Sequence, residues 1–190
     1  RKIFLSDKNI VKNFNKKNIP TNVKLNNLRY NSNIIKKSLK NKKNNPFDGV
    51  SINSKTTKKN NLFIAIKGKK NDGHNFVKEA LKKGANYCII SKSIKKNSRC
   101  IKVNNTMSFL NKLANNKRNE SSSRYIAVTG SSGKTTVKTM LGNLLKIFEK
   151  TYFSPKSYNN HYGVPLSVTN MNPDDNFGVF EVGMNKPNEI

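Results

Sequence analysis

The stretch YIAVTGSSGKTTVKTMLGNLLKIF, from Tyr125 to Phe148, contains three local patterns in succession. It begins with the apolar, β-branched run Tyr125–Thr129, which predicts a buried strand. The sequence Gly130-Ser-Ser-Gly133 then interrupts this run, as a tight turn requires. From Lys134 onward, apolar residues recur at i, i+3, i+4, i+7, i+8 and i+11, which predicts an amphipathic helix with one apolar face. Those residues are Val137, Met140, Leu141, Leu144, Leu145 and Phe148.

A strand, a glycine turn and a helix in this order predict an anion-binding site. The first turn of a helix has N–H groups without intrahelical partners and carries a partial positive charge. The turn brings backbone N–H groups close to a phosphate, Lys134 adds a positive charge, and the Thr135 hydroxyl can bind Mg²⁺. The turn is the short form G-x-x-G-K-T, whereas the usual phosphate loop has four residues between its glycines. The predicted nucleotide-phosphate site consists of Gly130, Ser131, Ser132, Gly133, Lys134, Thr135 and Thr136. The alternative is a purely structural strand-to-helix turn.

A second candidate site residue is Glu181. The run Phe177–Val182 is otherwise apolar on both faces, as in strands that a parallel sheet buries on both sides. A carboxylate there must be paired or bound to a metal. It also lies near the carboxyl end of its strand, where open α/β sheets bind ligands. An acid that binds a metal or orients water follows the phosphate loop in other phosphate-loop enzymes, which makes Glu181 a candidate for either role. The alternative is a glutamate on an exposed edge strand.

Strands and helices alternate in the rest of the chain, which predicts an α/β fold. The predicted strands are 49–53, 61–66, 85–90, 100–103 and 151–153, and the predicted helices are 75–83, 106–118 and a short one opened by Pro165. The polar segment Asn119–Ser123 predicts a domain boundary. We expect a Lys- and Asn-rich leader with short helices at 1–45, a small α/β domain at 46–119, and the first part of a parallel-sheet phosphate-loop domain at 120–190.

The net charge of +27 suggests a nucleic-acid-binding protein, but its distribution argues against one. Residues 1–120 contain 30 of the 37 Lys and Arg residues, interspersed with Asn and not gathered on one helix face. No motif for stacking bases between aromatic and basic side chains appears among them. We expect a solvated basic surface and no nucleic-acid partner, and a basic module that binds nucleic acid through residues 1–120 is the alternative.

Two other function classes are disfavoured by the sequence. No apolar run approaches the length needed to cross a bilayer, so we expect no membrane insertion. The only cysteines are Cys88 and Cys100, and neither their spacing nor their neighbours suggest a metal site. Cys88 lies in the apolar run Tyr87–Ile90, which predicts a buried thiol in a reducing compartment.

Together these motifs resemble the Mur ligase family, the ATP-dependent amide-forming enzymes of peptidoglycan synthesis. The family's short G-x-x-G-K-T/S phosphate loop is matched by Gly130–Thr135. Its N-N-x-x-G-x-P stretch is similar to Asn159–Pro165, and its E-x-G strand end, whose Glu binds Mg²⁺, is similar to Glu181–Gly183. The resemblance places Asn159, Asn160 and His161 beside the reacting substrate. For His161 the alternative is a solvent-facing loop residue.

The preceding region is similar to the family's UDP-substrate domain. Three elements match, D-S-R, L-F-x-A-x-x-G and D-G-H-x-F, and they lie within Val50–Lys55, Leu62–Gly68 and Asp72–Phe76. Asn53 and Lys55 replace the usual Asp and Arg, which keeps the positive charge but loses a bidentate contact. The substrate-binding residues that the resemblance implies here are Ser54, Lys55, Asp72, Gly73 and His74. His74 is expected to belong to the substrate loop and not to act as a catalyst.

The resemblance covers residues 47–190 and is closest to the family member that adds D-alanyl-D-alanine to a UDP-N-acetylmuramoyl tripeptide. It implies that ATP, with Mg²⁺, phosphorylates the terminal peptide carboxylate, and that the amine of D-alanyl-D-alanine attacks the acyl phosphate. It also implies that Lys134 and Glu181 are the catalytic residues and that Thr135 and Glu181 hold Mg²⁺. A monomeric, cytoplasmic enzyme is implied. The family's later catalytic elements do not follow Glu181, so we expect this chain to be inactive alone. Another ligase of the family is the alternative. Residues 1–14 resemble the closing segment of the preceding ligase in the pathway, which suggests a fused reading frame.

Overall fold

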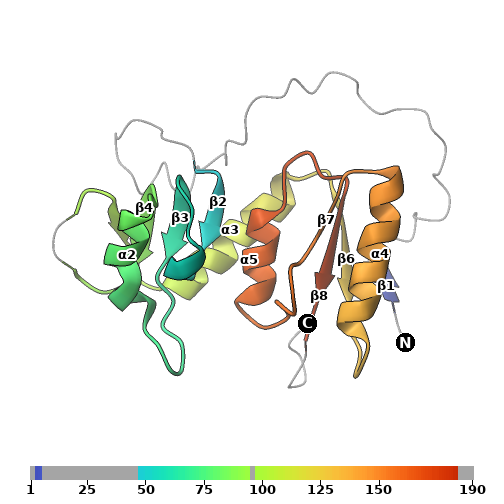
Figure 1. Cartoon of the computed structure of the whole chain (residues 1–190), viewed down its shortest axis with the longest axis horizontal. Coiled ribbons are helices and arrows are strands. Elements are labelled where there is room, and N and C mark those ends of the chain that lie inside the picture. Colours follow the sequence, from blue (N-terminus) through green and yellow to red (C-terminus); the bar gives the residue numbers. More distant parts are fainter. Residues whose placement is uncertain (1–2, 6–46, 95–96, 184–190) are drawn as a thin grey trace. The chain divides into compact units, whose positions relative to one another are not determined.

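The computed structural model describes residues 3–5, 47–94 and 97–183 of the 190-residue chain (Figure 1). These residues fall into two compact units. The first contains residues 3–5, 121–167 and 171–183, and the second contains residues 47–120 and 168–170. Most of the predicted leader, with its short helices, lies outside the described residues. None of the described helices is long and apolar enough to cross a bilayer.

The first unit contains a four-stranded sheet in the order β1-β6-β8-β7. Its strands are β1 (Ile3–Leu5), β6 (Arg124–Val128), β7 (Thr151–Phe153) and β8 (Phe177–Glu181), and its helix α4 is Lys134–Phe148. Strand β8 runs parallel to both β6 and β7, while β1 is antiparallel to β6. Because β8 lies between two strands and is buried from Gly178 to Glu181, the predicted buried strand is confirmed. The exposed-edge alternative for Glu181 is wrong.

The predicted helix after the glycine turn is confirmed as α4, but the predicted single apolar face is wrong. Three of its apolar residues pack on the sheet around Ile126, Val128 and Val179. The packed residues are Val137, Leu141 and Leu145, and the residues that are 67%, 54% and 73% exposed are Met140, Leu144 and Phe148.

The inward face of α4 is instead rotated toward Lys138 and Gly142, both of which are buried. A Cβ atom on Gly142 would lie 2.5 Å from the ring of Phe153 on β7. Glycine therefore lets the helix and this strand approach closely, and this approach turns the neighbouring apolar residues away from the sheet. A pattern of apolar residues does not include glycine or lysine, so the sequence spacing alone predicted the wrong buried face for this helix.

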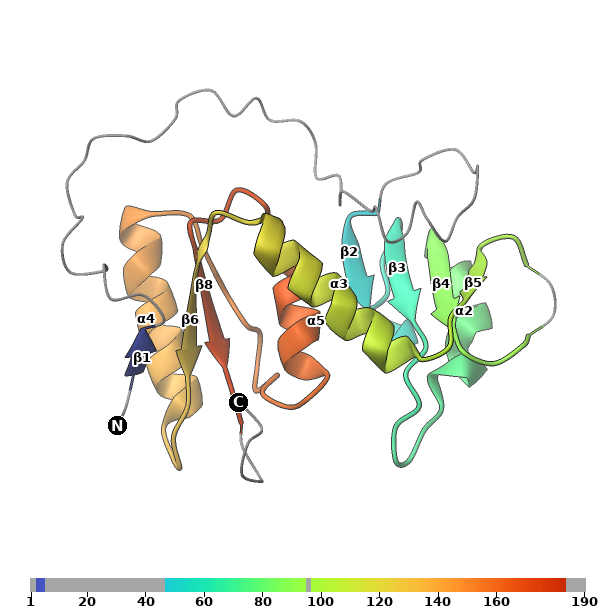
Figure 2. The same ribbon diagram turned by 180° about the vertical axis from the view of Figure 1, so that it is seen from behind.

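The second unit is a four-stranded parallel sheet in the order β2-β3-β4-β5. Its strands are β2 (Gly49–Ser51), β3 (Asn61–Ile64), β4 (Tyr87–Ile90) and β5 (Cys100–Lys102). Its helices are α2 (Val77–Lys82) and α3 (Thr106–Glu120), with the short 3₁₀ helices η1 (Ser54–Thr56) and η2 (Gly73–Phe76). The two opposite views show α2 on one face of this sheet and α3 on the other (Figures 1 and 2). The predicted α/β fold is thus confirmed for both units, and the first unit adds the antiparallel strand β1 to its parallel strands.

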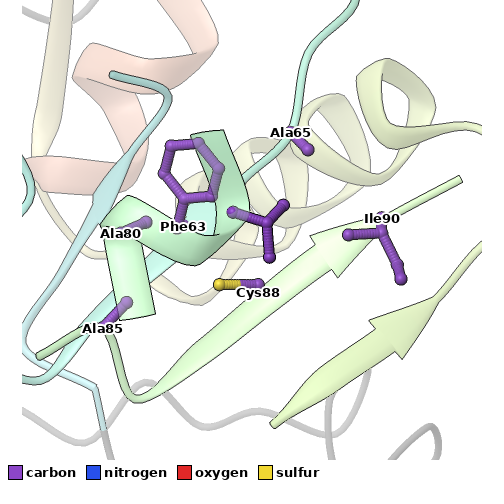
Figure 3. Close-up of a cluster of buried hydrophobic side chains, with 7 residues drawn as sticks. Phe63, Ala65, Ala80, Ala85, Cys88 and Ile90 are labelled. Carbon is purple, nitrogen blue, oxygen red and sulfur yellow. The ribbon is translucent and has the colours of Figure 1, made fainter. Parts of the chain in front are cut away.

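The core on the α2 face of this sheet packs one large aromatic side chain, Phe63, among smaller ones (Figure 3). Its members are Phe63, Ala65, Val77, Ala80, Ala85, Cys88 and Ile90. The predicted buried thiol of Cys88 is confirmed, and burial raises the pKa of this thiol to about 12. Both cysteines are free, although Cys88 and Cys100 are register partners on neighbouring strands.

The last predicted helix is α5 (Gly163–Asn170), which begins two residues before Pro165. Proline is tolerated there because the first-turn N–H groups of a helix have no intrahelical partners.

Candidate active site

The predicted strand–turn–helix unit is present, and two of its backbone positions require glycine. Strand β6 ends at Val128 and α4 begins at Lys134. Gly130 has φ +148° and Gly133 has φ +72°, values that residues with a side chain rarely adopt. Gly133 is also the N-cap of α4, and the first turn of α4 contains no acidic residue. The turn therefore presents the positive end of a helix, which favours an anion.

The Lys134 side chain lies over this turn. Its Nζ donates hydrogen bonds to the backbone carbonyls of Gly130 at 2.7 Å and Ser131 at 3.4 Å. These are neutral acceptors, which a phosphate can replace as partners of the ammonium group. Ser131, Ser132 and Thr136 are exposed. The predicted phosphate-binding residues are thus contiguous and open to solvent, apart from the half-buried Lys134.

Glu181 lies at the end of β8, beside this turn. It is 2% exposed. Its Oε2 accepts a hydrogen bond from Thr135 Oγ1 at 2.7 Å, and its Oε1 accepts one from Asn159 Nδ2 at 2.8 Å. Its backbone N–H donates to Ser154 Oγ at 3.2 Å. The two residues predicted to share a metal, Thr135 and Glu181, are therefore in direct contact.

Sequence reasoning missed Lys138. Its Nζ lies 3.7 Å from Glu181 Oε2 and donates a hydrogen bond to the carbonyl of Lys156. The prediction that Glu181 must be paired or metal-bound is confirmed by this ion pair. A signal existed in the sequence, because Lys138 follows Thr135 by three residues and so lies on the same side of the helix.

The oxygen atoms of Thr135 and Glu181 suit Mg²⁺. Mg²⁺ prefers hard oxygen ligands about 2.1 Å away in an octahedron, which places neighbouring ligand atoms about 3 Å apart. The separation of 2.7 Å between Thr135 Oγ1 and Glu181 Oε2 is close to that value. The described residues contain no cluster of three or more His, Cys, Asp or Glu side chains. Mg²⁺ commonly takes one or two protein ligands and completes its shell with phosphates and water, so two oxygens fit this ion.

Asn159, Asn160 and His161, predicted to lie beside the substrate, have different surroundings. The Asn159 side chain donates to Glu181, and the Asn159 backbone carbonyl accepts a hydrogen bond from Gly183 N–H at 2.7 Å. Asn160 Oδ1 accepts one from Gly163 N–H at 2.8 Å, at the start of α5. His161 is exposed, and its ring contacts that of Tyr162 edge to face. Asn159 thus belongs to the Glu181 cluster, while Asn160 helps to cap a helix.

In the second unit, the predicted substrate residues follow parallel strands at the carboxyl edge of the sheet. Ser54 and Lys55 follow β2, and Asp72, Gly73 and His74 follow β3. Ser54 is buried and donates to Glu79 Oε2 at 2.9 Å, whereas Lys55 is exposed. A Cβ on Gly73 would lie 2.8 Å from the backbone of Ile66, so this turn also requires glycine. This edge is where open α/β sheets bind ligands.

His74 is buried, and both of its ring nitrogens are engaged. Its Nδ1 lies 2.6 Å from Asp72 Oδ1, and its Nε2 accepts a hydrogen bond from Ser91 N–H at 2.9 Å. Lys92 Nζ lies 2.5 Å from Asp72 Oδ2. Hydrogen bonds from Lys92 and then His74 hold the pKa of Asp72 well below its ordinary value. His74, one of the predicted substrate residues, thus joins the loop after β3 to the residues that follow β4. These are Ser91 and Lys92, which the sequence did not indicate.

Two family descriptions match separate parts of this chain. Residues 46–118 match the Mur ligase family catalytic domain, and residues 128–189 match the Mur ligase middle domain. The first match contains the second unit's parallel sheet. The second contains the phosphate-loop turn, Asn159 and Glu181.

Individual relatives agree with these matches. The chain is 40% identical over 143 residues to UDP-N-acetylmuramoyl-tripeptide--D-alanyl-D-alanine ligase of Rickettsia prowazekii, covering 74% of the chain and 32% of that relative. It is 34% identical to the ligase of the same name from Bacillus subtilis, covering 75% of the chain and 32% of the relative. A crystal structure of MurF ligase from Thermotoga maritima in complex with ADP is 37% identical, with a TM-score of 0.63, covering 73% of the chain and 33% of that structure.

The chain spans about a third of the length of these relatives. Its phosphate-loop turn, its Glu181 strand end and the parallel sheet of the second unit lie in the matched regions. The chain therefore belongs to the Mur ligase family.

Proposed function

We propose that this chain is part of an ATP-dependent ligase that adds D-alanyl-D-alanine to a UDP-N-acetylmuramoyl tripeptide. The observation that carries the proposal is the contact between Thr135, at the start of α4, and Glu181, at the end of β8. It joins a phosphate-binding turn to a buried carboxylate, as nucleotide-dependent phosphoryl transfer requires. The relatives named for this activity support the choice of substrate.

In this proposal the turn Gly130–Gly133 holds the β- and γ-phosphates of ATP through backbone N–H groups. Lys134 exchanges its carbonyl partners for phosphate oxygens and neutralises charge that develops there during transfer. Thr135 and Glu181 hold Mg²⁺, which withdraws charge from the phosphates when it is bound. The terminal carboxylate of the UDP-linked peptide attacks the γ-phosphate, and ADP leaves. The amine of D-alanyl-D-alanine then attacks the carbonyl carbon of the acyl phosphate, so that an amide bond forms, inorganic phosphate leaves and the amine loses a proton.

The substrate and domain assignments are part of the same proposal. We assign residues 46–119 to the UDP-substrate domain and residues 120–190 to the first part of the ATP-binding domain. The two matched ranges and the two compact units support this division. Ser54, Lys55, Asp72, Gly73 and His74 would form the substrate edge. A monomer acting in the cytoplasm is the corresponding expectation, and the two free cysteines agree with a reducing compartment.

The first experiment measures binding of a fluorescent ATP analogue to the chain with Mg²⁺. We expect saturable binding that Lys134→Ala abolishes, because this change removes the positive charge at the turn. The matched control is Lys146→Ala. This lysine is an exposed residue of the same helix, twelve positions after Lys134, and its Nζ lies 4.7 Å from the centroid of the Phe153 ring and not at the turn, so the variant should bind normally. Equal binding by wild type and Lys134→Ala would argue against a phosphate site at this turn.

The second experiment tests the substrates. Phosphate release is measured for the chain and for the protein encoded by its complete reading frame. Each is given ATP, UDP-N-acetylmuramoyl tripeptide and one candidate amine at a time. We expect the protein encoded by the complete frame to release phosphate only with D-alanyl-D-alanine, and the chain alone to release none. Release with diaminopimelate or lysine would instead indicate another ligase of the family.

A further inference from the structure

Lys138 is a lysine whose side chain the protein encloses. It is 1% exposed, and its ammonium group has two partners, the carboxylate of Glu181 and the carbonyl of Lys156. Lysine is almost never fully buried unless it is paired, because removing an ammonium ion from water is costly. Its position beside Glu181 therefore fits a role at the site more readily than a role in apolar packing.

We propose that Lys138 is a positioning residue that fixes the Glu181 carboxylate for Mg²⁺, an inference that rests on the proposed function. Asn159 holds Oε1 of this carboxylate, and Thr135 and Lys138 both approach Oε2. Of these three neighbours, only Lys138 carries a charge. It offsets the buried negative charge before the metal arrives, and its contact with Oε2 helps to hold the carboxylate in place.

Lys138 also connects Glu181 to the segment that supplies Asn159. The carbonyl that accepts its hydrogen bond belongs to Lys156, which has φ +50°, an uncommon value for a residue with a side chain. Three residues later, Asn159 donates to the same carboxylate. Loss of the Lys138 ammonium would thus remove the counter-ion of Glu181 and a restraint on the Asn159 amide. Lys138 acts through Glu181 and needs no contact with the nucleotide.

The test compares nucleotide affinity of the full chain with Mg²⁺ and with EDTA, using a fluorescent ATP analogue. The ratio of the two affinities isolates the metal's contribution. We expect Lys138→Met to lower this ratio roughly tenfold, the usual cost of removing a group that orients a metal ligand, and to leave the affinity in EDTA unchanged. Lys138→Arg should preserve the ratio, because it keeps the charge, and so should Lys146→Met, which changes an exposed residue of the same helix.

A purely structural role would give a different result. If Lys138 only stabilised the fold, Lys138→Met would lower both affinities together and leave their ratio unchanged. A ratio that is unchanged or larger in this variant would overturn the proposal. So would an equal loss in Lys138→Arg and Lys138→Met.

A second measurement separates this inference from the proposed function. If the wild-type chain binds no nucleotide, the proposed function fails, and the thermal unfolding midpoints of four proteins then decide the Lys138 inference. These are wild type, Lys138→Met, Glu181→Gln and the double variant. We expect Lys138→Met to lower the midpoint much less when Glu181 is already Gln, because the uncompensated carboxylate is then gone. Equal lowering in both backgrounds would refute the positioning role, as would a double variant that does not fold.

Discussion

Glu181→Gln is expected to destabilise the first unit strongly, although it only replaces one side-chain oxygen by an NH2 group. The side-chain volume is kept, and the Gln carbonyl can still accept the hydrogen bond from Thr135, but the amide group then replaces the oxygen that accepts from Asn159. The change removes the charge 3.7 Å from Lys138 Nζ and leaves this ammonium enclosed, with the Lys156 carbonyl as its acceptor. Breaking a buried ion pair from one side in this way costs about 3–5 kcal/mol.

The structure allows this magnitude to be worked out independently. Two unit charges 3.7 Å apart at an effective dielectric constant of about 20 attract each other by about 4 kcal/mol. The retained hydrogen bonds to Thr135 and Lys156 favour the lower end of the range. We therefore expect the free energy of unfolding to fall by about 3 kcal/mol.

The assay is urea unfolding followed by circular dichroism, with hydrogen exchange of peptides from α4 and β8 to locate the effect. The matched control is Asp174→Asn, which breaks the ion pair of Lys150 and Asp174, whose side chains are 66% and 48% exposed. Solvent screens that pair, so its loss should leave the unfolding midpoint unchanged. If Glu181→Gln shifted the midpoint no more than Asp174→Asn does, the claim that Lys138 depends on Glu181 would be refuted.

Three further predictions concern stability and reactivity. Gly142→Ala should lower the free energy of unfolding by about 1–3 kcal/mol, because its Cβ would meet the Phe153 ring, whereas Gly68→Ala, which meets only ordinary contacts, should change the thermal midpoint little. Asp72→Asn should make the free energy of unfolding depend less steeply on pH below pH about 4. The depressed pKa of Asp72 adds stability above pH about 4 that is lost as the pH falls further, and unfolding at stepped pH measures this slope. Cys88 should react with iodoacetamide only after unfolding, because its thiol is buried and has a pKa of about 12. Rapid labelling of Cys88 in the native chain, located by mass spectrometry of the peptide that contains it, would contradict this.

Much of the fold was predictable because it depends on short-range order. Alternation of apolar runs with glycine turns located most strands and helices, since the backbone geometry of each is set by neighbouring residues. The requirement for glycine at Gly130 and Gly133 was readable for the same reason. Glu181 was identifiable as a buried carboxylate with a partner because a charge within an apolar strand needs one.

The identity of this partner was not predicted. The spacing puts Lys138 on the same side of the helix as Thr135, but spacing does not show whether a lysine is buried. Lys138 lies in a helix where it looks like any exposed lysine, and Gly142 looks like an interruption of the apolar pattern. Their burial follows from how α4 is rotated on the sheet, and that rotation depends on Phe153, which comes from a later strand. The family resemblance placed Asn159 beside the substrate, which stays a prediction, but it did not indicate that this side chain donates to Glu181.

The sequence by itself therefore determined which residue types stand at the phosphate turn, on the buried strand and in the loop between them. Only the tertiary structure decided which of them touch. Thr135, Asn159 and Glu181 come from separate segments, and crossover connections bring β6, β8 and β7 together in an order that differs from the order along the chain. Contacts of this kind depend on the packing of whole elements, and local propensity carries no information about them.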